Sequence, residues 1–311
     1  MKKFLAVVIA GDEATVETVS NKTSVANKVS HNLVVEDFIE TTEDGNGVLQ
    51  SIEFKNEDKF NFAFDVVDEI GRQYPEKLAM LHIADDLTER RFTFKDIKEG
   101  SSQAANYFKS LGIKKGDRVL LVLKRNYQFW LAILGLHKLG AVAIPATNQL
   151  VVHDYEYRFN AAGVSAVVVT ADGIATDYID EAQKNCPTLK TKIVANGKKD
   201  GWHSFDDEYG LFSRRFVRGE DAPCGDDPMI MFFTSGTTGL AKGVMLSHKN
   251  IASNVYNMSK YVKIMDGGVG LSVLPMHHTY EMTCHVMTGL FQGVTIAICE
   301  GLKHIQKNLQ E

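Results

Sequence analysis

The 311-residue sequence predicts an α/β fold in which mostly parallel sheets are covered by helices. Between residues 118 and 195, short apolar runs alternate with helical segments, which is the pattern of repeated β-α-β units. The apolar runs contain few polar residues, as is typical of strands buried on both faces. The composition, 44% hydrophobic and 23% charged, excludes a wholly disordered, collagen-like or coiled-coil chain.

Several elements are expected before this alternation begins. The sequence predicts a helix over residues 64–74, a strand over 78–83, and a short strand over 91–94 that leads into a second helix. Thr93 and Asp96 have the spacing of a capping box at the start of that helix, although Asp is a weaker partner there than Glu or Gln. Gly112 supplies the signal for its end.

The alternation itself predicts seven elements. Strands are expected over 118–123, 141–145, 164–170 and 190–195, with helices between them over 127–138, 153–162 and 175–185. Residues 196–228 are polar and contain Gly, Asp and Pro throughout, so we expect a long connection over the surface.

Residues 1–58 are expected to be an N-terminal extension of a domain that occupies residues 59–311. The extension is rich in Thr, Val, Asn and Glu, includes a turn-like stretch at 44–47, and shows no pattern typical of a catalytic or binding site. The apolar run at 4–10 follows two lysines and superficially resembles a signal peptide, but it is short and acidic residues follow at once. We therefore expect a β-strand or a disordered start there.

Charge and cysteine content limit the classes of function. The 34 Lys and Arg against 39 Asp and Glu give a formal net charge of −5, and so no reason to expect nucleic acid or an anionic membrane as a partner. No apolar run approaches the roughly 20 residues of a transmembrane helix. The 4 cysteines include no Cys-x-x-Cys pair, which fits a reducing compartment, and we expect a cytoplasmic protein. The oligomeric state is not predicted.

The segment at residues 229–248 carries the strongest chemical signal. An apolar strand at 229–233 runs into a loop of small and hydroxyl-bearing residues, and a second apolar strand at 244–246 leaves it. Glycines allow backbone N–H groups to turn toward an anion, while hydroxyls and a lysine offer further phosphate ligands. These residues are Thr234, Ser235, Gly236, Thr237, Thr238, Gly239, Lys242 and Gly243. The sequence therefore predicts a phosphate-binding loop.

Two other interpretations of this loop are weaker. The P-loop of NTPases requires Gly-Lys-Ser/Thr followed by a helix, whereas here Ala241 precedes Lys242, Gly243 follows it and a strand comes next. No Ser or Thr follows the lysine to hold magnesium. A plain hairpin turn would need neither four hydroxyls nor a lysine.

Residues 234–243 (Thr-Ser-Gly-Thr-Thr-Gly-Leu-Ala-Lys-Gly) resemble the signature loop of the adenylate-forming superfamily, which comprises acyl-CoA synthetases, nonribosomal adenylation domains and luciferases. The family's loop usually has Pro where this chain has Ala241, which frees the φ angle but removes no ligand group. Residues 92–97, 136–145 and 274–281 resemble further family motifs in the expected order. The resemblance covers roughly residues 60–311 and implies the large N-terminal domain of that fold.

The resemblance implies an acyl-CoA synthetase that uses ATP, Mg²⁺ and coenzyme A. A fatty or other small carboxylate would attack the α-phosphorus of ATP, and the thiol of CoA would then displace AMP. Lys242 and the loop residues 234–239 would bind the phosphates, and His278 would line the acyl pocket. Lys242 and His278 are the two expected catalytic residues. Signals for medium-chain and long-chain acids conflict, so the acyl chain length stays open, as does a carrier protein in place of CoA.

A cluster near residue 280 raises the question of a metal site. His278, Glu281 and His285 fall on one face of a helix, with Cys284 adjacent. The His-Glu-x-x-His pattern of a zincin is absent, so we expect no metal ligation by these residues. A simple core role stays open for His278, and His277 and Glu281 are weaker candidates for the site.

The sequence also departs from the family. Family members are much longer, and the Tyr-Gly-x-Thr-Glu motif for adenine and magnesium does not occur here. We therefore expect an N-terminal part of the enzyme, truncated before the C-terminal domain, that is poor or inactive in adenylation by itself. The alternative is a non-catalytic nucleotide-binding or scaffold protein that retains the phosphate loop.

Overall fold

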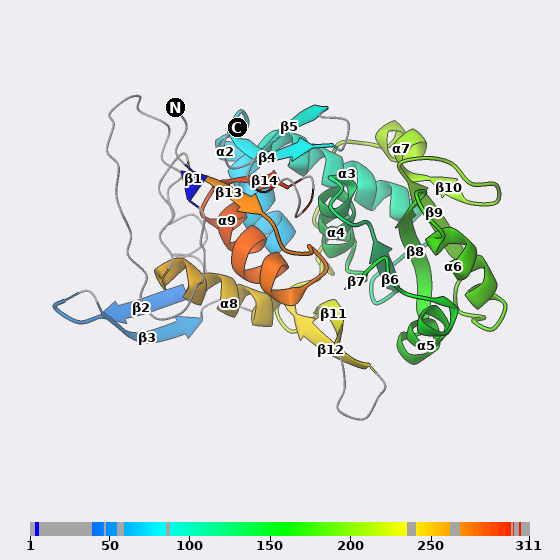
Figure 1. Ribbon diagram of the computed structural model, residues 1–311. Coiled ribbons are helices and arrows are strands. Elements are labelled where there is room, and N and C mark those ends of the chain that lie inside the picture. Colours follow the sequence, from blue (N-terminus) through cyan, green and yellow to red (C-terminus); the bar gives the residue numbers. More distant parts are fainter. Residues whose placement is uncertain are drawn as a thin grey trace.

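A computed structural model of the chain shows two large sheets with helices between and around them (Figure 1). The structure describes residues 4–5, 39–46, 48–54, 59–84, 88–234, 241–261, 268–299, 301 and 305. Among these residues, no helix has both the length and the apolar character that a membrane crossing requires.

The larger sheet has seven strands in the order β10-β9-β8-β6-β7-β11-β12. All neighbours pair in parallel except β11 and β12, which form an antiparallel hairpin. The strands are β6 (Arg118–Val122), β7 (Val142–Pro145), β8 (Val164–Thr170), β9 (Thr191–Ala195), β10 (His203–Ser204), β11 (Pro228–Thr234) and β12 (Lys242–Ser247). The parallel alternation expected between residues 118 and 195 is confirmed.

The smaller sheet has five strands in the order β1-β13-β14-β4-β5. It is parallel except at its edge, where β4 and β5 pair antiparallel. Its strands are β1 (Phe4–Leu5), β4 (Leu78–Ile83), β5 (Glu89–Thr93), β13 (Val269–Ser272) and β14 (Thr295–Ile298). Strand β4 therefore joins segments that lie more than half the chain apart.

Alternate side chains of the central strand β6 enter two different cores. Val119 and Leu121 belong to the core that also contains α3 (Phe94–Ser110), α4 (Gln128–Leu139) and residues of the five-stranded sheet. Leu120 and Val122 belong to a second core, covered by α5 (Val152–Ala162) and α6 (Ala175–Gln183). Because successive strand side chains point to opposite faces, α3 and α4 lie between the two sheets (Figure 1).

One predicted helix differs in type, and several helices had not been predicted. The helix expected over 64–74 is found as a π-helix, η2 (Phe62–Asp68), continued by α2 (Glu69–Gln73). The capping box of Thr93 and Asp96 is present. Near the chain's end are α8 (His248–Tyr261), a second π-helix, η4 (Glu281–Met287), and α9 (Thr288–Phe291). The turn expected at 44–47, of which Gly47 lies outside the described residues, joins β2 (Ile39–Glu43) to β3 (Leu49–Phe54).

The expectation of a plain surface connection over 196–228 is wrong in part. This segment contains β10, α7 (Phe205–Glu208) and the 3₁₀ turn η3 (Tyr209–Leu211). Phe205 is fully buried, and its ring lies 5.9 Å from that of Tyr107 and 6.1 Å from that of Phe108. The overall polar composition concealed the aromatic side chains that anchor the segment, which are Phe205 and, beside it, Tyr209 and Phe212.

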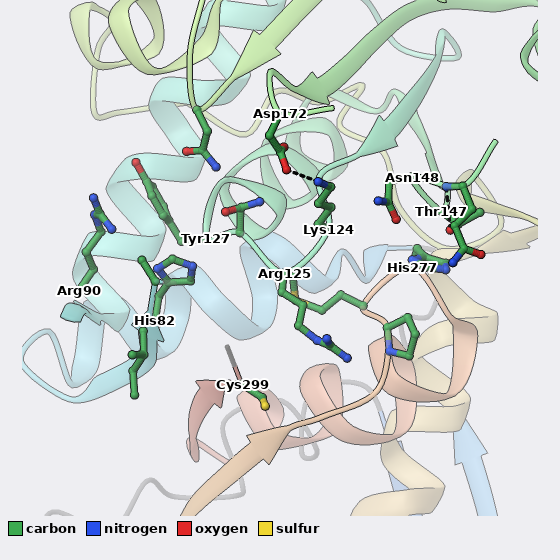
Figure 2. Close-up of a pocket in the computed structure, with 17 residues that line it drawn as sticks. His82, Arg90, Lys124, Arg125, Tyr127, Thr147, Asn148, Asp172, His277 and Cys299 are labelled. Atoms are coloured by element: carbon green, nitrogen blue, oxygen red, sulfur yellow. Dashed lines mark hydrogen bonds and ion pairs between the residues drawn. The ribbon is translucent and has the colours of Figure 1, made fainter. Parts of the chain in front are cut away.

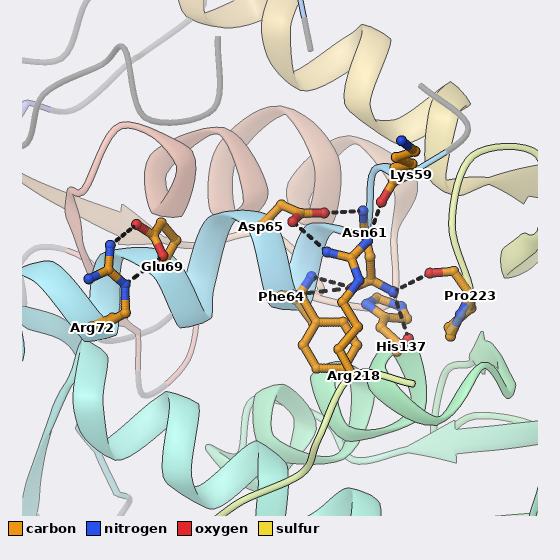
Figure 3. Close-up of polar contacts among 10 residues, drawn as sticks. Lys59, Asn61, Phe64, Asp65, Glu69, Arg72, His137, Arg218 and Pro223 are labelled. Carbon is orange, nitrogen blue, oxygen red and sulfur yellow. Dashed lines mark hydrogen bonds and ion pairs between the residues drawn. The ribbon is translucent and has the colours of Figure 1, made fainter. Parts of the chain in front are cut away.

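The later part of the same segment is joined to the start of η2 by a hydrogen bond and an ion pair (Figure 3). Asn61 is fully buried, and its Nδ2 donates to the carbonyl oxygens of His137 at 3.0 Å and Pro223 at 2.8 Å. Arg218 Nη1 lies 2.6 Å from Asp65 Oδ1. The connection is therefore fixed in place before it enters β11.

Candidate functional site

One cavity lies where the carboxyl ends of strands from both sheets meet (Figure 2). Its volume is about 730 Å³. The seven-stranded sheet contributes residues 124–127, 147–149, 172 and 196, which follow β6, β7, β8 and β9. The five-stranded sheet contributes residues 82–84, 90, 275–277 and 299. Parallel α/β proteins bind ligands at this edge, because side chains from several loops converge there.

Among the described residues, the lining of the cavity has an excess of positive charge. Arg90, Lys124 and Arg125 line it, and Asp172 is the one carboxylate that the described residues contribute. The guanidinium of Arg125 donates through Nη2 to the carbonyl of Val273, while its Nε is buried without a hydrogen-bond partner among the described residues. Such a lining favours an anionic ligand.

The lysine after β6 sits in an uncommon backbone conformation. Lys124 has φ +50° and Asn196 has φ +56°, and both residues line the cavity. They are the positive-φ residues other than glycine in the part of the chain that the structure describes. Such conformations cluster at functional sites, since only a well-determined surrounding structure maintains them.

Lys124, which follows β6, forms an ion pair with Asp172, which follows β8, at the carboxyl ends of these strands (Figure 2). Burial disfavours the carboxylate, but hydrogen bonds from Lys124 and Thr170 outweigh it and hold the pKa of Asp172 below its ordinary value. Asp172 therefore stays ionised at neutral pH, and no other carboxylate of the described lining faces the charges of Arg90 and Arg125.

A second group of contacts fixes the wall formed by Tyr127 and Asn196. Asp206 of α7 accepts from the hydroxyl of Tyr127 at 3.2 Å, from Gln128 Nε2 at 2.8 Å and from the backbone N–H of Asn196 at 2.7 Å. Gln128 Nε2 also donates to Asn196 Oδ1 at 2.6 Å. Burial, followed by the charge of Asp206, raises the pKa of Tyr127, so this phenol remains a neutral donor.

The strand–loop–strand arrangement expected around residue 238 is confirmed at its two ends. β11 and β12 pair antiparallel, with Thr234 opposite Lys242, and Thr234 Oγ1 lies 3.5 Å from the carbonyl oxygen of Lys242. Both side chains are exposed. Because β11 lies beside β7, the hairpin leaves the same edge of the sheet as the cavity-lining loop 147–149.

Most of the predicted loop lies outside the described residues: Ser235, Gly236, Thr237, Thr238 and Gly239. The role of this segment in phosphate binding therefore stays a prediction. Lys242 is described, and it forms no ion pair with any residue in the described ranges.

The two histidines of the next motif occupy different positions. His277 lines the cavity, and burial, followed by the charges of His278 and Arg125, lowers its pKa. His278 is exposed and is not part of the lining; its Nδ1 accepts from the backbone N–H of Tyr280 at 3.4 Å. The role predicted for His278 in an acyl pocket stays a prediction, and of these two neighbours it is His277 that lines the cavity.

Glu281 and His285 are engaged with each other. Glu281 is buried, and its Oε1 accepts from Ser272 Oγ at 2.5 Å and lies 2.9 Å from His285 Nδ1. Among the described residues, no three His, Cys, Asp or Glu side chains are grouped so that they could hold a metal ion. Glu281 thus connects the end of β13 to η4 and closes the loop that carries His277.

Sequence reasoning did not select Arg90, Lys124, Arg125 or Asp206. A usable signal existed for two of them, because Lys124 and Arg125 follow directly after an apolar strand in an alternating pattern. For Arg90 and Asp206 there was no signal, since their approach to the cavity depends on how distant segments pack.

Comparisons with known proteins agree with this geometry. A family model described as AMP-binding enzyme matches residues 67–310. The acyl-coenzyme A synthetase ACSM5, mitochondrial, of Rattus norvegicus is 34% identical over 194 residues, which are 60% of this chain and 32% of that protein. The crotonobetaine/carnitine–CoA ligase of Salmonella paratyphi A is 28% identical over 239 residues, which are 75% of this chain and 45% of that protein. The chain thus matches less than half the length of these two relatives.

Solved structures show the same fold. The N-terminal domain of FACL13 from Mycobacterium tuberculosis superposes with a TM-score of 0.71 at 24% identity, covering 79% of this chain and 59% of that one. The anthranilate CoA ligase AuaEII, in complex with anthranoyl-AMP, gives a TM-score of 0.70 at 21% identity, covering 80% and 47%. The expected fold class, an N-terminal adenylate-forming domain with mostly parallel sheets, is confirmed.

Proposed function

From the premise that this chain belongs to the family of AMP-binding enzymes, we propose that it serves in the ATP-dependent activation of a carboxylate for transfer to coenzyme A. The curated relatives named above are an acyl-coenzyme A synthetase and a carnitine–CoA ligase, and AuaEII is described with an acyl adenylate bound. The proposed substrate is a fatty acid or another small organic acid. The proposed location of the protein is the cytoplasm.

The proposed reaction has two steps. A carboxylate oxygen bonds to the α-phosphorus of ATP as the bond to the bridging oxygen breaks, and pyrophosphate leaves with the electron pair. The sulfur of CoA then bonds to the acyl carbon, AMP leaves, and the thiol proton is released. The first step brings two anions together, so most of its barrier is electrostatic repulsion and positioning.

The observation that supports the proposal is the positive charge of described residues at the edge of the fold where the β11–β12 hairpin ends. Lys242 begins β12 opposite Thr234, exposed and free of ion pairs with the described residues. Arg90 and Arg125 line the cavity at the same edge of the fold. Positive charge held at fixed positions stabilises the charge that develops on transferred and departing phosphates.

The family implies Mg²⁺ as well. Among the described residues, no three His, Cys, Asp or Glu side chains are grouped as metal ligands, and the carboxylate that lines the cavity, Asp172, is paired with Lys124. Magnesium held mainly through nucleotide phosphates needs only one or two carboxylates.

The test is ATP–pyrophosphate exchange on the purified chain with acids of increasing chain length, together with direct measurement of ATP binding. Exchange that depends on the acid supports carboxylate activation and identifies the acid. ATP binding without exchange is the result we expect of an N-terminal part by itself; it would support nucleotide binding and would leave carboxylate activation and a nucleotide-binding protein without the chemistry undivided. Absence of ATP binding would refute both. A thioester assay offering CoA and a carrier protein side by side identifies the acceptor.

A further inference from the structure

Helix α5 supports the base of the β11–β12 hairpin from one side. The hydroxyl of Tyr157 donates to the carbonyl oxygen of Ala241 at 2.7 Å. This is a contact between residues 84 positions apart, and Ala241 directly precedes Lys242. A short, neutral hydrogen bond of this kind fixes one peptide group in orientation as well as position.

The same turn of α5 also holds the other arm of the hairpin. The Tyr157 ring meets that of Phe233 edge to face, with centroids 6.3 Å apart, and the Arg158 guanidinium lies 5.3 Å from the centre of the Phe233 ring. Arg158 is itself held by Asp154 one turn earlier, through Nη1 to the backbone oxygen at 3.1 Å. Two adjacent side chains thus contact both strands where they enter and leave the loop.

Ala241, whose carbonyl oxygen accepts the hydrogen bond from Tyr157, is the position where this sequence departs from the usual loop of its family. The signature loop usually has Pro before its lysine, and here the residue is Ala241. Proline fixes φ near −65°, whereas alanine leaves that angle free and so leaves the direction of the following residue less defined. A hydrogen bond to the carbonyl of Ala241 limits the rotation of that peptide group by other means.

We propose that Tyr157 is a positioning residue for Lys242, which it orients through the carbonyl of Ala241 in place of the usual proline. It does not touch the nucleotide; it reduces the number of directions in which the lysine leaves the hairpin, so less entropy is lost when phosphate is bound. The inference rests on the proposed function, because it takes ATP phosphates as the ligand of Lys242.

The primary variant is Tyr157→Phe, which deletes the hydroxyl and retains the ring on Phe233. We expect ATP affinity, measured by calorimetry on the full chain, to fall about three- to tenfold, the range of one neutral hydrogen bond. The matched control is Tyr155→Phe on the same helix, because the Tyr155 hydroxyl is buried without a partner among the described residues. The control should bind ATP like the wild type.

A double-mutant cycle separates positioning from a general structural effect. If Tyr157 acts through Lys242, Tyr157→Phe changes ATP affinity by less than about twofold in a Lys242→Ala background. Adding Ala241→Pro to Tyr157→Phe should restore affinity to near the wild-type value. Thermal unfolding of each variant shows whether the fold is intact.

The outcomes distinguish the two proposals. No ATP binding by the wild type refutes the proposed function. Binding by the wild type with unchanged affinity in Tyr157→Phe overturns the positioning role alone. An equal loss from Tyr157→Phe with and without Lys242 also overturns it, since the hydroxyl would then act elsewhere.

Discussion

Lys242 is the residue on which the proposed phosphate site depends. Lys242 is the first residue of β12, is exposed and forms no ion pair with the described residues, so none of their carboxylates competes with a ligand for it. Lys242→Ala should weaken ATP binding about tenfold to hundredfold, as expected for one hydrogen bond to a charged group. Titration calorimetry at low and high salt measures it, and the loss should be smaller at high salt.

Lys184→Ala is the control for this experiment. Lys184 pairs with Glu181 on the surface of α6 and does not line the cavity, so its removal should leave ATP affinity unchanged. Equal affinities of Lys242→Ala and the wild type would contradict the phosphate role of the loop.

At the scale of single residues, sequence reasoning succeeded where chemistry was local and failed where it depended on packing. Thr234 and Lys242 stood out because hydroxyls, glycines and a lysine occur together within ten residues. Which of His277 and His278 faces the cavity could not be read, because adjacent side chains diverge and the loop conformation decides. Asp206 organises Tyr127 and Asn196 from about eighty and ten residues away, and no spacing rule reports such contacts.

At the scale of elements, α3 and α4 approach each other closely at Gly135. A Cβ built on Gly135 would lie 2.9 Å from Ala104 Cβ, 3.0 Å from the backbone nitrogen of Ala105 and 3.1 Å from the carbonyl oxygen of Ser101. Two of these atoms belong to the backbone of α3, and displacing them would distort the helix at a cost in free energy. The small residue therefore sets how near the two helices approach and how close the sheets lie.

The variant Gly135→Ala tests this close approach, because the gain in helix propensity and the cost of overpacking act in opposite directions. Alanine gains about 1 kcal/mol of helix propensity, but overpacking costs about 1–3 kcal/mol, so we expect the free energy of unfolding to fall by up to about 2 kcal/mol. Urea unfolding measures it. Gly210→Ala is the control, because nothing lies within 4 Å of a Cβ built there. A more stable Gly135→Ala variant would show that the interface has room.

The β-α-β alternation was predictable because each element carries its own periodic signal. Strands β6 to β9 and helices α3 to α6 were found at or within a few residues of their expected bounds. The π-helical form of η2 was not, because it depends on tertiary packing around buried Phe62 and Val66 rather than on a distinct sequence pattern. Nor was the pairing of β14 with β4, which joins residues over two hundred positions apart.

At the scale of the whole molecule, the candidate site exists because two sheets turn the carboxyl ends of their strands toward one cavity. The seven-stranded sheet contributes Lys124, Arg125 and Asp172, and the five-stranded sheet contributes Arg90 and His277. Neither sheet alone provides the whole lining, so the cavity depends on the two sheets being packed together through α3 and α4. The stability of the fold and the geometry of the site are therefore linked.

The same central region makes that stability sensitive to acid. His137 of α4 and His248 at the start of α8 are buried, with ring centroids 6.0 Å apart, and none of their four ring nitrogens has a hydrogen-bond partner among the described residues. Burial, followed by the charge of His248, lowers the pKa of His137 well below its ordinary value. For His248, burial lowers the pKa to about 3, against the opposing charge of Asp227 and with the charges of Arg218 and Lys115.

Whether acid lowers or raises the free energy of unfolding depends on whether the folded or the unfolded state binds more protons. In the folded protein both rings are neutral, whereas in the unfolded chain each binds a proton below the ordinary histidine pKa of 6.5. Their contribution to stability is therefore complete above that pH and is lost as the pH falls from 6.5 toward the folded-state values. Each ring can remove up to about 1.4 kcal/mol per pH unit in this window.

Urea unfolding at several pH values between about 7 and about 5 measures the slope of the unfolding free energy. We expect it to fall with pH, and His248→Phe to reduce the slope while keeping an aromatic ring against His137. The slope that remains comes from His137 and from His277, whose pKa is also lowered. His153→Gln, which replaces a histidine whose side chain is 82% exposed, should leave the slope unchanged. Carboxylates held below their ordinary pKa, such as Asp172 and Asp227, are still ionised in this window, so they do not imitate the effect. A slope unaltered by His248→Phe would mean that acid sensitivity arises elsewhere in the fold.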